Sequence, residues 1–150
     1  MRHELHTQVD IEATRETVWN VLTDLDRYSD WNPFIVDATG DIAVGSKLTN
    51  RMQAPGGKAM TIKPAVTSVE PEQTFEWLGH FGVRGVFDGR HRFELQATPS
   101  GGTRVTHTEQ FQGVLVRFMR KTLDTQTKSG FEAMNSALKT RAEAEARAAS

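Results

Sequence analysis

The chain of 150 residues contains no cysteine. This absence excludes disulfide cross-links, thiolate zinc sites and cysteine nucleophiles. Long apolar runs are missing as well, and none approaches the roughly 20 residues of a membrane-spanning helix. The sequence after Met1 has no apolar signal core and enters a strand-like pattern at once. We therefore predict a cytoplasmic protein without a membrane span.

An excess of charge of one sign is also lacking. The 18 Lys and Arg residues stand against 19 Asp and Glu residues, which gives a formal net charge of -1. Proteins that hold nucleic acid mainly through its phosphates normally show a basic excess or stripe, so we predict no nucleic-acid partner. No two histidines have the i, i+4 spacing of a helical zinc site, and neither a metal nor a cofactor is predicted.

A chain of this length, with 37% hydrophobic residues, fits a single domain with a sizeable core. Residues 3–11 alternate between apolar and polar side chains, as in a strand. Thr14 is a candidate N-cap for a helix whose apolar residues follow at helical spacing, and Pro33 ends this helical segment. The domain is therefore expected to begin with one strand and a helical pair.

Residues 34–112 carry mostly strand signals, separated by short turns that contain glycine or proline. Short connections between successive strands predict an antiparallel meander. The predicted strands lie near 34–39, 46–54, 58–69, 73–82, 86–98 and 103–112. No proline occurs from about Leu115 to Ala146, which predicts a long C-terminal helix. Its tail, residues 141–150, has little to bury and is predicted to fray.

Alternation also predicts how the strands pair. Folding one hairpin about Arg84 pairs Phe75 with Phe93 and Trp77 with His91, so that the apolar faces match. The opposite face of the second strand is charged and should be solvated, with cross-strand ion pairs that each contribute less than about 1 kcal/mol. The charged residues of that face are Asp88, Arg90, Arg92 and Glu94.

The last two strands are predicted to form a hairpin folded about Gly101. This register pairs Phe93 with Glu109 and His91 with Phe111. The apolar faces match again, whereas a slip of one residue would place them on opposite sides of the sheet.

The order of the predicted elements is one strand, a helical pair, six strands and a long helix. This order predicts an α+β fold in which a curved, antiparallel, seven-stranded sheet wraps around the C-terminal helix. Four glycines would help the sheet bend. They are Gly79, Gly82, Gly85 and Gly89. A strongly curved sheet closed by a helix leaves space between them, so we expect a cavity there.

Several runs of the sequence resemble one known family. They are "LTDLDRYSDWNPF", "AVGSKL", "VTSVEPEQTFEW", "GGTRVTHTEQFQG" and the C-terminal helix. Together they resemble the SRPBCC superfamily, the START and pollen-allergen helix-grip group, and in particular its bacterial polyketide-cyclase/dehydrase-like branch. The resemblance covers roughly residues 3 to 140. It implies a helix-grip fold whose cavity binds a hydrophobic small molecule, and it brings no universal catalytic motif.

The residues predicted to face the cavity are mostly aromatic or apolar and lie on the inner side of a strand or of the last helix. They are Asn50, Met52, Phe75, Trp77, Phe81, His91, Phe93, His107, Glu109, Phe111, Met119, Leu123 and Phe131. Plain core packing is the alternative for the aromatic members, and for His91 a satisfied core histidine is favoured over a catalytic base.

His107 and Glu109 are the candidates for chemistry, although no catalytic residue is assigned. Both alternate in phase with Val105 and Phe111, so both should point inward among apolar groups. Burying such groups costs a few kcal/mol unless each finds a partner. An inward Glu109 should have a raised pKa and could orient a ligand or move a proton. Alternatively, Glu109 forms a structural hydrogen bond with a helix residue or with His91.

Three functions remain open. The first is binding of a hydrophobic small molecule, such as a lipid or a polyketide-like aromatic metabolite, by a monomer or homodimer. The second is an enzyme of the cyclase or dehydratase type that uses His107 or Glu109 as general acid or base. The third is a protein-interaction regulator that presents the basic start of the long helix, namely Arg117, Arg120 and Lys121.

Overall fold

The computed structural model describes residues 2–150, which form an α+β fold with two antiparallel sheets. The larger sheet has five strands in the order β1-β8-β7-β6-β5, and the smaller has three in the order β2-β3-β4. The strands are β1 (Arg2–Ile11), β2 (Ile35–Thr39), β3 (Thr49–Met52), β4 (Met60–Ile62), β5 (Ala65–Glu70), β6 (Thr74–His80), β7 (Asp88–Ala97) and β8 (Thr103–Gln112). The helices are α1 (Arg15–Thr23), the 3-10 helix η1 (Leu25–Arg27), α2 (Tyr28–Trp31), α3 (Val116–Thr122), the π-helix η2 (Leu123–Thr127) and α4 (Lys128–Ala149).

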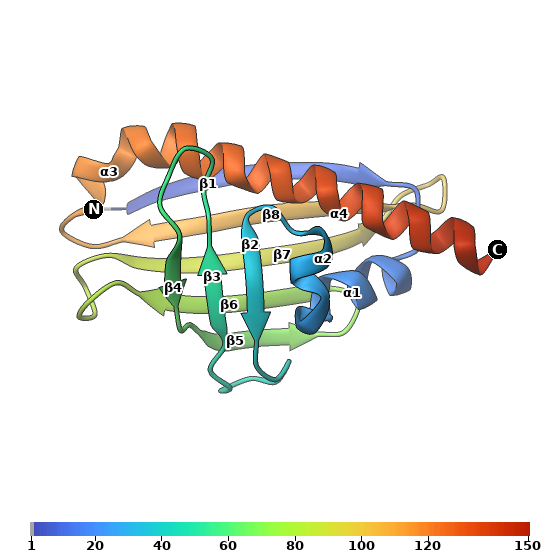
Figure 1. Cartoon of the computed structure of the whole chain (residues 1–150), viewed down its shortest axis with the longest axis horizontal. Coiled ribbons are helices and arrows are strands. Elements are labelled where there is room, and N and C mark those ends of the chain that lie inside the picture. The colour runs from blue at the N-terminus through green and yellow to red at the C-terminus, as the bar shows by residue number, and fades with distance from the viewer. Residues whose placement is uncertain (1) are drawn as a thin grey trace.

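The C-terminal helix packs on the larger sheet along β1 and also contacts the segment just before β2. In Figure 1, α4 runs along the β1 side of the larger sheet, and the strands of the smaller sheet run across those of the larger one. Phe131 of α4 lies 4.2 Å from the ring of His107 on β8 and 5.4 Å from the ring of Phe34, just before β2. The predicted fold class, a helix gripped by a curved antiparallel sheet, is confirmed.

The number of strands differs from the prediction. Residues 58–69 were expected as one strand, but they divide into β4 and β5 at Lys63 and Pro64, which gives eight strands within residues 2–150. Proline has no backbone N–H, so the ladder cannot run through it unbroken. The backbone N–H of Leu48 donates to the carbonyl of Pro64 (2.9 Å), and that of Val66 to the carbonyl of Ser46 (2.9 Å). These bonds join the edges of the two sheets.

The helical segment after β1 follows the predicted start and stop. Thr14 caps α1, since its side chain accepts a hydrogen bond from the backbone N–H of Thr17 (3.3 Å). After α2, the side-chain oxygen of buried Asn32 accepts the backbone N–H groups of Phe34 (3.0 Å) and Ile35 (2.9 Å). This side-chain turn brackets Pro33 and directs the chain from the helices into β2.

The two predicted hairpins have different outcomes. In the β6–β7 hairpin, Phe75 pairs with Phe93 and Trp77 with His91, as predicted. In the β7–β8 hairpin, His91 pairs with Glu109 rather than with Phe111. The register is shifted by two residues, which leaves every side chain on its predicted face, so face matching cannot detect the shift.

The turn between β7 and β8 sets that register. The backbone N–H of Gly101 donates to the carbonyl of Thr98 (3.0 Å), and that of Thr98 to the carbonyl of Gly102 (3.0 Å). Gly101 has a φ of 87°, which glycine adopts readily. The turn is therefore centred one residue before the predicted position, and the correct pairing of Phe93 is with His107.

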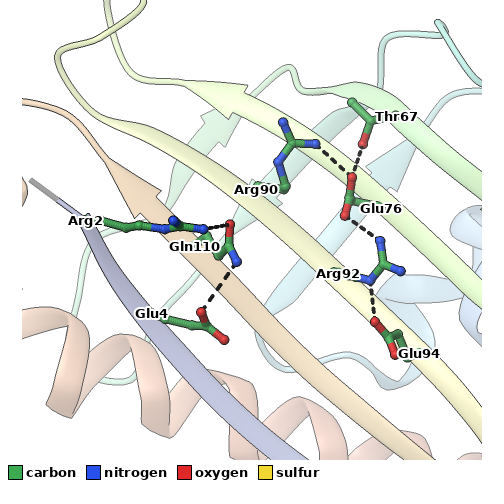
Figure 2. A network of polar contacts seen from close by, with 8 residues as sticks. All are labelled: Arg2, Glu4, Thr67, Glu76, Arg90, Arg92, Glu94 and Gln110. Atoms are coloured by element: carbon green, nitrogen blue, oxygen red, sulfur yellow. Dashed lines mark hydrogen bonds and ion pairs between the residues drawn. The ribbon is translucent and has the colours of Figure 1, made fainter.

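The outer face of the larger sheet carries the predicted ion pairs. Figure 2 shows the carboxylate of Glu76 between two arginines of β7. Arg90 and Arg92 each donate to it over 2.8 Å, and the hydroxyl of Thr67 donates to it as well (2.8 Å). Asp88 pairs with His80 instead (2.6 Å). The polar face thus follows the alternation of the strands.

The tail of α4 stays helical through Ala149 in the structure. Ala142 is buried, and the carboxylate of Glu143 accepts from Lys139 (2.6 Å) and from the backbone N–H of Glu12 (2.8 Å). Fraying beyond these contacts stays a prediction. No helix within residues 2–150 combines the length and the apolar character that crossing a membrane requires.

Gly130 allows α4 to approach the smaller sheet. A Cβ atom at this position would lie 2.6 Å from Cε1 and 3.2 Å from Cγ of the buried Phe34 ring. We expect Gly130→Ala to destabilise the fold by about 1–3 kcal/mol through this overlap, despite the roughly 1 kcal/mol that alanine gains in helix propensity. Urea denaturation measures the change. Ser129→Ala at the exposed neighbouring position is the control, and a Gly130→Ala variant at least as stable as Ser129→Ala would contradict this packing.

Candidate functional site

A cavity of about 430 Å³ opens at the end of the fold where the β3–β4 hairpin meets α3 and η2. Phe81, Phe87 and Phe111 from the larger sheet and its β6–β7 connection form one side of the wall. Met52, Met60 and Ile62 from the smaller sheet form another, and Leu115, Met119 and Leu123 close it from the helix. The wall is predominantly apolar, and its ionisable residues are Glu109 and Lys58.

The structure divides the predicted ligand-binding residues into two groups. Those on the cavity wall are Met52, Phe81, Glu109, Phe111, Met119 and Leu123. Those buried in the packed core away from the wall are Asn50, Phe75, Trp77, His91, Phe93, His107 and Phe131. Contact of any of them with a ligand stays a prediction.

Ring packing explains why the second group does not reach the cavity. Phe131 of α4 stacks on His107 with an interplanar angle of 3°, and its centroid lies 5.0 Å from that of His91. Phe93 also stacks on His107, with the two ring centroids 4.3 Å apart. These rings fill the space between the middle of the sheet and α4. The open volume therefore lies toward α3, at one end of the predicted location.

Several wall residues were not among the predicted set. Those from the β3–β4 hairpin are Ala54, Gly57, Lys58, Met60 and Ile62, and the others are Phe34, Phe87, Leu115, Thr122, Gln126 and Thr127. Turn chemistry at residues 55–57 marks this segment as a hairpin in the sequence. Nothing local to the segment indicates that it folds over the end of the larger sheet.

The helix side of the wall includes a π-helical turn. In η2, the backbone N–H of Lys128 donates to the carbonyl of Leu123, five residues earlier. Leu123, Gln126 and Thr127 from this turn line the cavity. Single π-helical turns within α-helices occur frequently at functional sites, which fits the position of η2.

A continuous chain of buried side-chain hydrogen bonds leads from the cavity into the core. Oε1 of Glu109 lies 3.2 Å from Nδ1 of His91, and Nε2 of His91 lies 2.6 Å from Nε2 of His107. Nδ1 of His107 lies 2.8 Å from Oδ1 of Asn135. The amide of Asn135 donates to Oγ1 of Thr7 (2.9 Å), and Thr7 donates to the backbone carbonyl of His107 (2.8 Å).

The far end of this chain determines the direction of donation. Since the hydroxyl proton of Thr7 goes to a backbone carbonyl, Oγ1 of Thr7 must accept from the amide of Asn135. Oδ1 of Asn135 then faces His107 and accepts from its Nδ1, which leaves Nε2 of His107 without a proton in the neutral ring. Nε2 of His91 must therefore donate to His107.

The same reasoning fixes the state of Glu109. Because His91 is protonated at Nε2, its Nδ1 is an acceptor, and the carboxyl of Glu109 must donate to it as a protonated acid. Burial raises the pKa of Glu109 to about 8 and lowers the pKa of His91 to about 3. Burial, and then the neighbouring His91, also hold the pKa of His107 well below its usual range. Geometry and burial agree on an uncharged network near neutral pH.

Aromatic rings hold both imidazoles in place. Trp77 stacks on His91 at 4.5 Å with an interplanar angle of 15°. Phe93 and Phe131 stack on the two sides of His107. The ring planes that carry the hydrogen bonds are therefore set by packing, and the two histidines are fully buried.

Gly89 provides room for the carboxyl group of Glu109. A Cβ atom at Gly89, the neighbour of Phe111 across β7 and β8, would collide with Oε2 of Glu109. Glu109 keeps 9% of its surface exposed, and it is the one member of the hydrogen-bond chain on the cavity wall. Any exchange of protons between a bound molecule and the buried histidines would have to pass through this carboxyl group.

The protein belongs to the family described as polyketide cyclase / dehydrase and lipid transport, whose model matches residues 2–143. No curated protein matches the sequence. The fold is that of the Zhui aromatase/cyclase of a Streptomyces species, with a TM-score of 0.81 and 16% identity over 99% of this chain and 98% of that one. The predicted membership of the START/SRPBCC superfamily is confirmed.

Two further solved structures are similar. A START superfamily protein from Mycobacterium smegmatis has a TM-score of 0.72 and 20% identity, with 99% of each chain covered. A point mutant of norcoclaurine synthase from Thalictrum has a TM-score of 0.74 and 14% identity, with 97% of this chain and 96% of that one covered. At these identities the likeness shows the fold alone. Family and fold together support a ligand-binding or cyclase role.

The network predicts how stability depends on pH. Between the ordinary pKa of 4.5 and the folded value of about 8, Glu109 keeps its proton in the folded chain and has lost it in the unfolded chain. Its contribution to stability is therefore complete below pH 4.5 and is lost as the pH rises to about 8. The two histidines act in the opposite direction below their ordinary pKa of 6.5, where unfolding lets them take up protons.

Above pH 6.5 the loss due to Glu109 is no longer opposed by these histidines. We expect the unfolding free energy of the wild type to fall relative to Glu109→Gln by about 1.4 kcal/mol per pH unit near pH 6.5, and by about half of that per pH unit near pH 8. Urea denaturation across this range measures the difference. Glu145→Gln, at an exposed site on α4, should leave the wild-type slope unchanged. Parallel stability curves for the wild type and Glu109→Gln would show that the carboxyl is ionised in the folded protein.

Proposed function

We propose that the protein binds a hydrophobic small molecule, a lipid or a polyketide-like aromatic metabolite, in the cavity between the β3–β4 hairpin and α3. The observation that carries this proposal is the composition of the wall, in which aromatic, Met and Leu side chains surround the single carboxyl group of Glu109. A volume of about 430 Å³ lies within the range of small-molecule sites, roughly 300–1,000 Å³.

The three flexible methionines of the wall, Met52, Met60 and Met119, support a ligand of variable shape. Met60, Leu115 and Met119 are substantially exposed at 49%, 45% and 38%, although each also contributes to the wall. Apolar side chains at such a rim would be covered when a ligand enters, which favours binding of an apolar molecule over an empty cavity.

A second candidate function is a cyclase or dehydratase reaction, and the hydrogen-bond chain favours it. Oε2 of Glu109 would accept a proton from a bound substrate while Oε1 passes its own proton to Nδ1 of His91. The reverse shift would then deliver a proton from Oε2 to the leaving hydroxyl group of the substrate, so that the network is uncharged again at the end of the turnover. In this scheme Glu109 is the general acid or base, and His107 acts only through His91 because it does not reach the wall.

Filling the cavity tests the binding function. Ala54→Trp places a large side chain at the wall, whereas Ala148→Trp adds the same group at an exposed position of α4. The probe is uncharged N-phenyl-1-naphthylamine, whose emission rises in apolar surroundings. We expect saturable binding to the wild type and to Ala148→Trp, and at least about tenfold weaker binding to Ala54→Trp because the volume is occupied. Equal affinities of two folded variants would place the site elsewhere.

Turnover tests the enzymatic alternative. With an aromatic polyketide-like substrate, we expect an enzyme of this type to lose at least about 100-fold in kcat in Glu109→Gln, because Gln cannot transfer the proton. His107→Ala should lose activity as well. Glu94→Gln, on the outer face of β7, is the control. Wild-type turnover in both Glu109→Gln and His107→Ala would exclude this role for the network.

A further inference from the structure

The polar end of the cavity presents one particular hydrogen-bonding group. Oε1 of Glu109 is engaged by His91 at 3.2 Å, whereas Oε2 has no hydrogen-bond partner within residues 2–150. Oδ1 of Asn50 is unpaired and inaccessible to solvent, whereas Oε2 of Glu109 is not among the inaccessible unpaired atoms of the described residues. Because Glu109 lies on the wall, its free oxygen is the one available to a bound molecule.

The direction of the buried chain determines what that free oxygen is. Donation runs from Glu109 through His91, His107 and Asn135 to Thr7, and it ends on the backbone carbonyl of His107. The acid proton therefore sits on Oε1, and Oε2 is the carbonyl oxygen of a neutral acid. Such an oxygen accepts a hydrogen bond and cannot donate one.

Reversing the chain would cost a hydrogen bond at its far end. For Glu109 to donate toward the cavity, both histidines would have to exchange tautomers and the amide of Asn135 would have to turn over. The hydroxyl of Thr7 would then have to donate to Asn135 and could no longer donate to the carbonyl of His107. The single bond from Thr7 to that carbonyl therefore selects one direction for the whole chain.

We propose that the cavity selects uncharged aromatic ligands that present a hydrogen-bond donor, a phenolic or enolic hydroxyl, to Oε2 of Glu109, and that Thr7 is the positioning residue for this selectivity. The inference rests on the proposed binding function and specifies its ligand class. Thr7 lies on β1 and is buried, and it acts on the ligand only through Asn135 and the two histidines. A ligand that offers only a carbonyl group would place its acceptor oxygen against Oε2, which is also an acceptor, so no hydrogen bond could form between them.

The tautomers are directly measurable. In the ¹⁵N-labelled protein at pH 6.5, we expect His91 to be protonated at Nε2 and His107 at Nδ1, as read from the ¹⁵N shifts and couplings of the ring nitrogens. Single His91→Gln and His107→Gln variants assign the signals. Protonation of His91 at Nδ1 would reverse the chain and overturn the proposal.

Three probes that share one ring system test the selectivity at the same pH. They are 2-naphthol, which offers a donor, 2-methoxynaphthalene, which does not, and 2-acetonaphthone, which offers a carbonyl acceptor. We expect 2-naphthol to bind at least about fivefold more tightly than either of the others, the effect of one good hydrogen bond. Equal binding of all three would overturn this inference and leave the binding function intact. A preference for 2-acetonaphthone would overturn it as well, and binding of none would remove both.

Matched variants separate positioning from folding. Glu109→Gln should keep the preference for 2-naphthol, because its amide N–H can donate to His91 while its oxygen faces the cavity. Glu109→Leu should bind the three probes equally.

Thr7→Ser keeps the hydroxyl and should behave as the wild type, whereas Thr7→Val should reduce the preference to less than about twofold and produce a mixture of His91 tautomers. Wild-type selectivity in Thr7→Val, with His91 still protonated only at Nε2, would remove Thr7 from the proposal. The Glu109 pair tests the ligand class even where Thr7→Val fails to fold.

Discussion

The burial of two histidines side by side is the constraint on which the interior of this protein depends. Neither imidazole can hold a charge there, and each needs a donor and an acceptor at defined positions. The partners come from three strands and the last helix, since Glu109 and His107 lie on β8, His91 on β7, Thr7 on β1 and Asn135 on α4. One uncharged network thus ties the central strands to the helix that they grip.

This network also decides where the cavity lies. The imidazoles stack with Trp77, Phe93 and Phe131, and these rings occupy the middle of the space between sheet and helix. The remaining volume is displaced to the end that the β3–β4 hairpin and η2 enclose. Glu109 stands at the boundary between the two regions. A molecule in the cavity would contact the carboxyl group of Glu109, whose protonation is determined by its hydrogen bonds to the buried histidines.

The family includes polyketide cyclases and dehydrases as well as lipid transport, so membership is compatible with both transport and catalysis. Proteins that share a fold differ in function through their sites. Here the ionisable residues on the cavity wall are Glu109 on β8 and Lys58 on the β3–β4 hairpin. The outer network around Glu76 is separate from it, on the opposite face of the sheet. The chemistry available to the protein is therefore concentrated at Glu109.

Local patterns in the sequence were sufficient to predict the fold class, the helix capped by Thr14, the inward faces of the strands and the register of the β6–β7 hairpin. These features depend on alternation, helix caps and proline, which act over a few residues. The same patterns placed His107 and Glu109 in the interior. They could not detect the two-residue shift of the last hairpin, because this shift leaves every side chain on the same face. They also did not predict that the strand would be interrupted at Pro64, where the chain passes from the smaller sheet to the larger one. Only the tertiary structure brought Asn135 and Thr7, 128 positions apart in the chain, to one hydrogen bond. It alone could decide that the aromatic centre is filled and that a neutral carboxyl group faces the cavity, because these outcomes depend on contacts between distant segments.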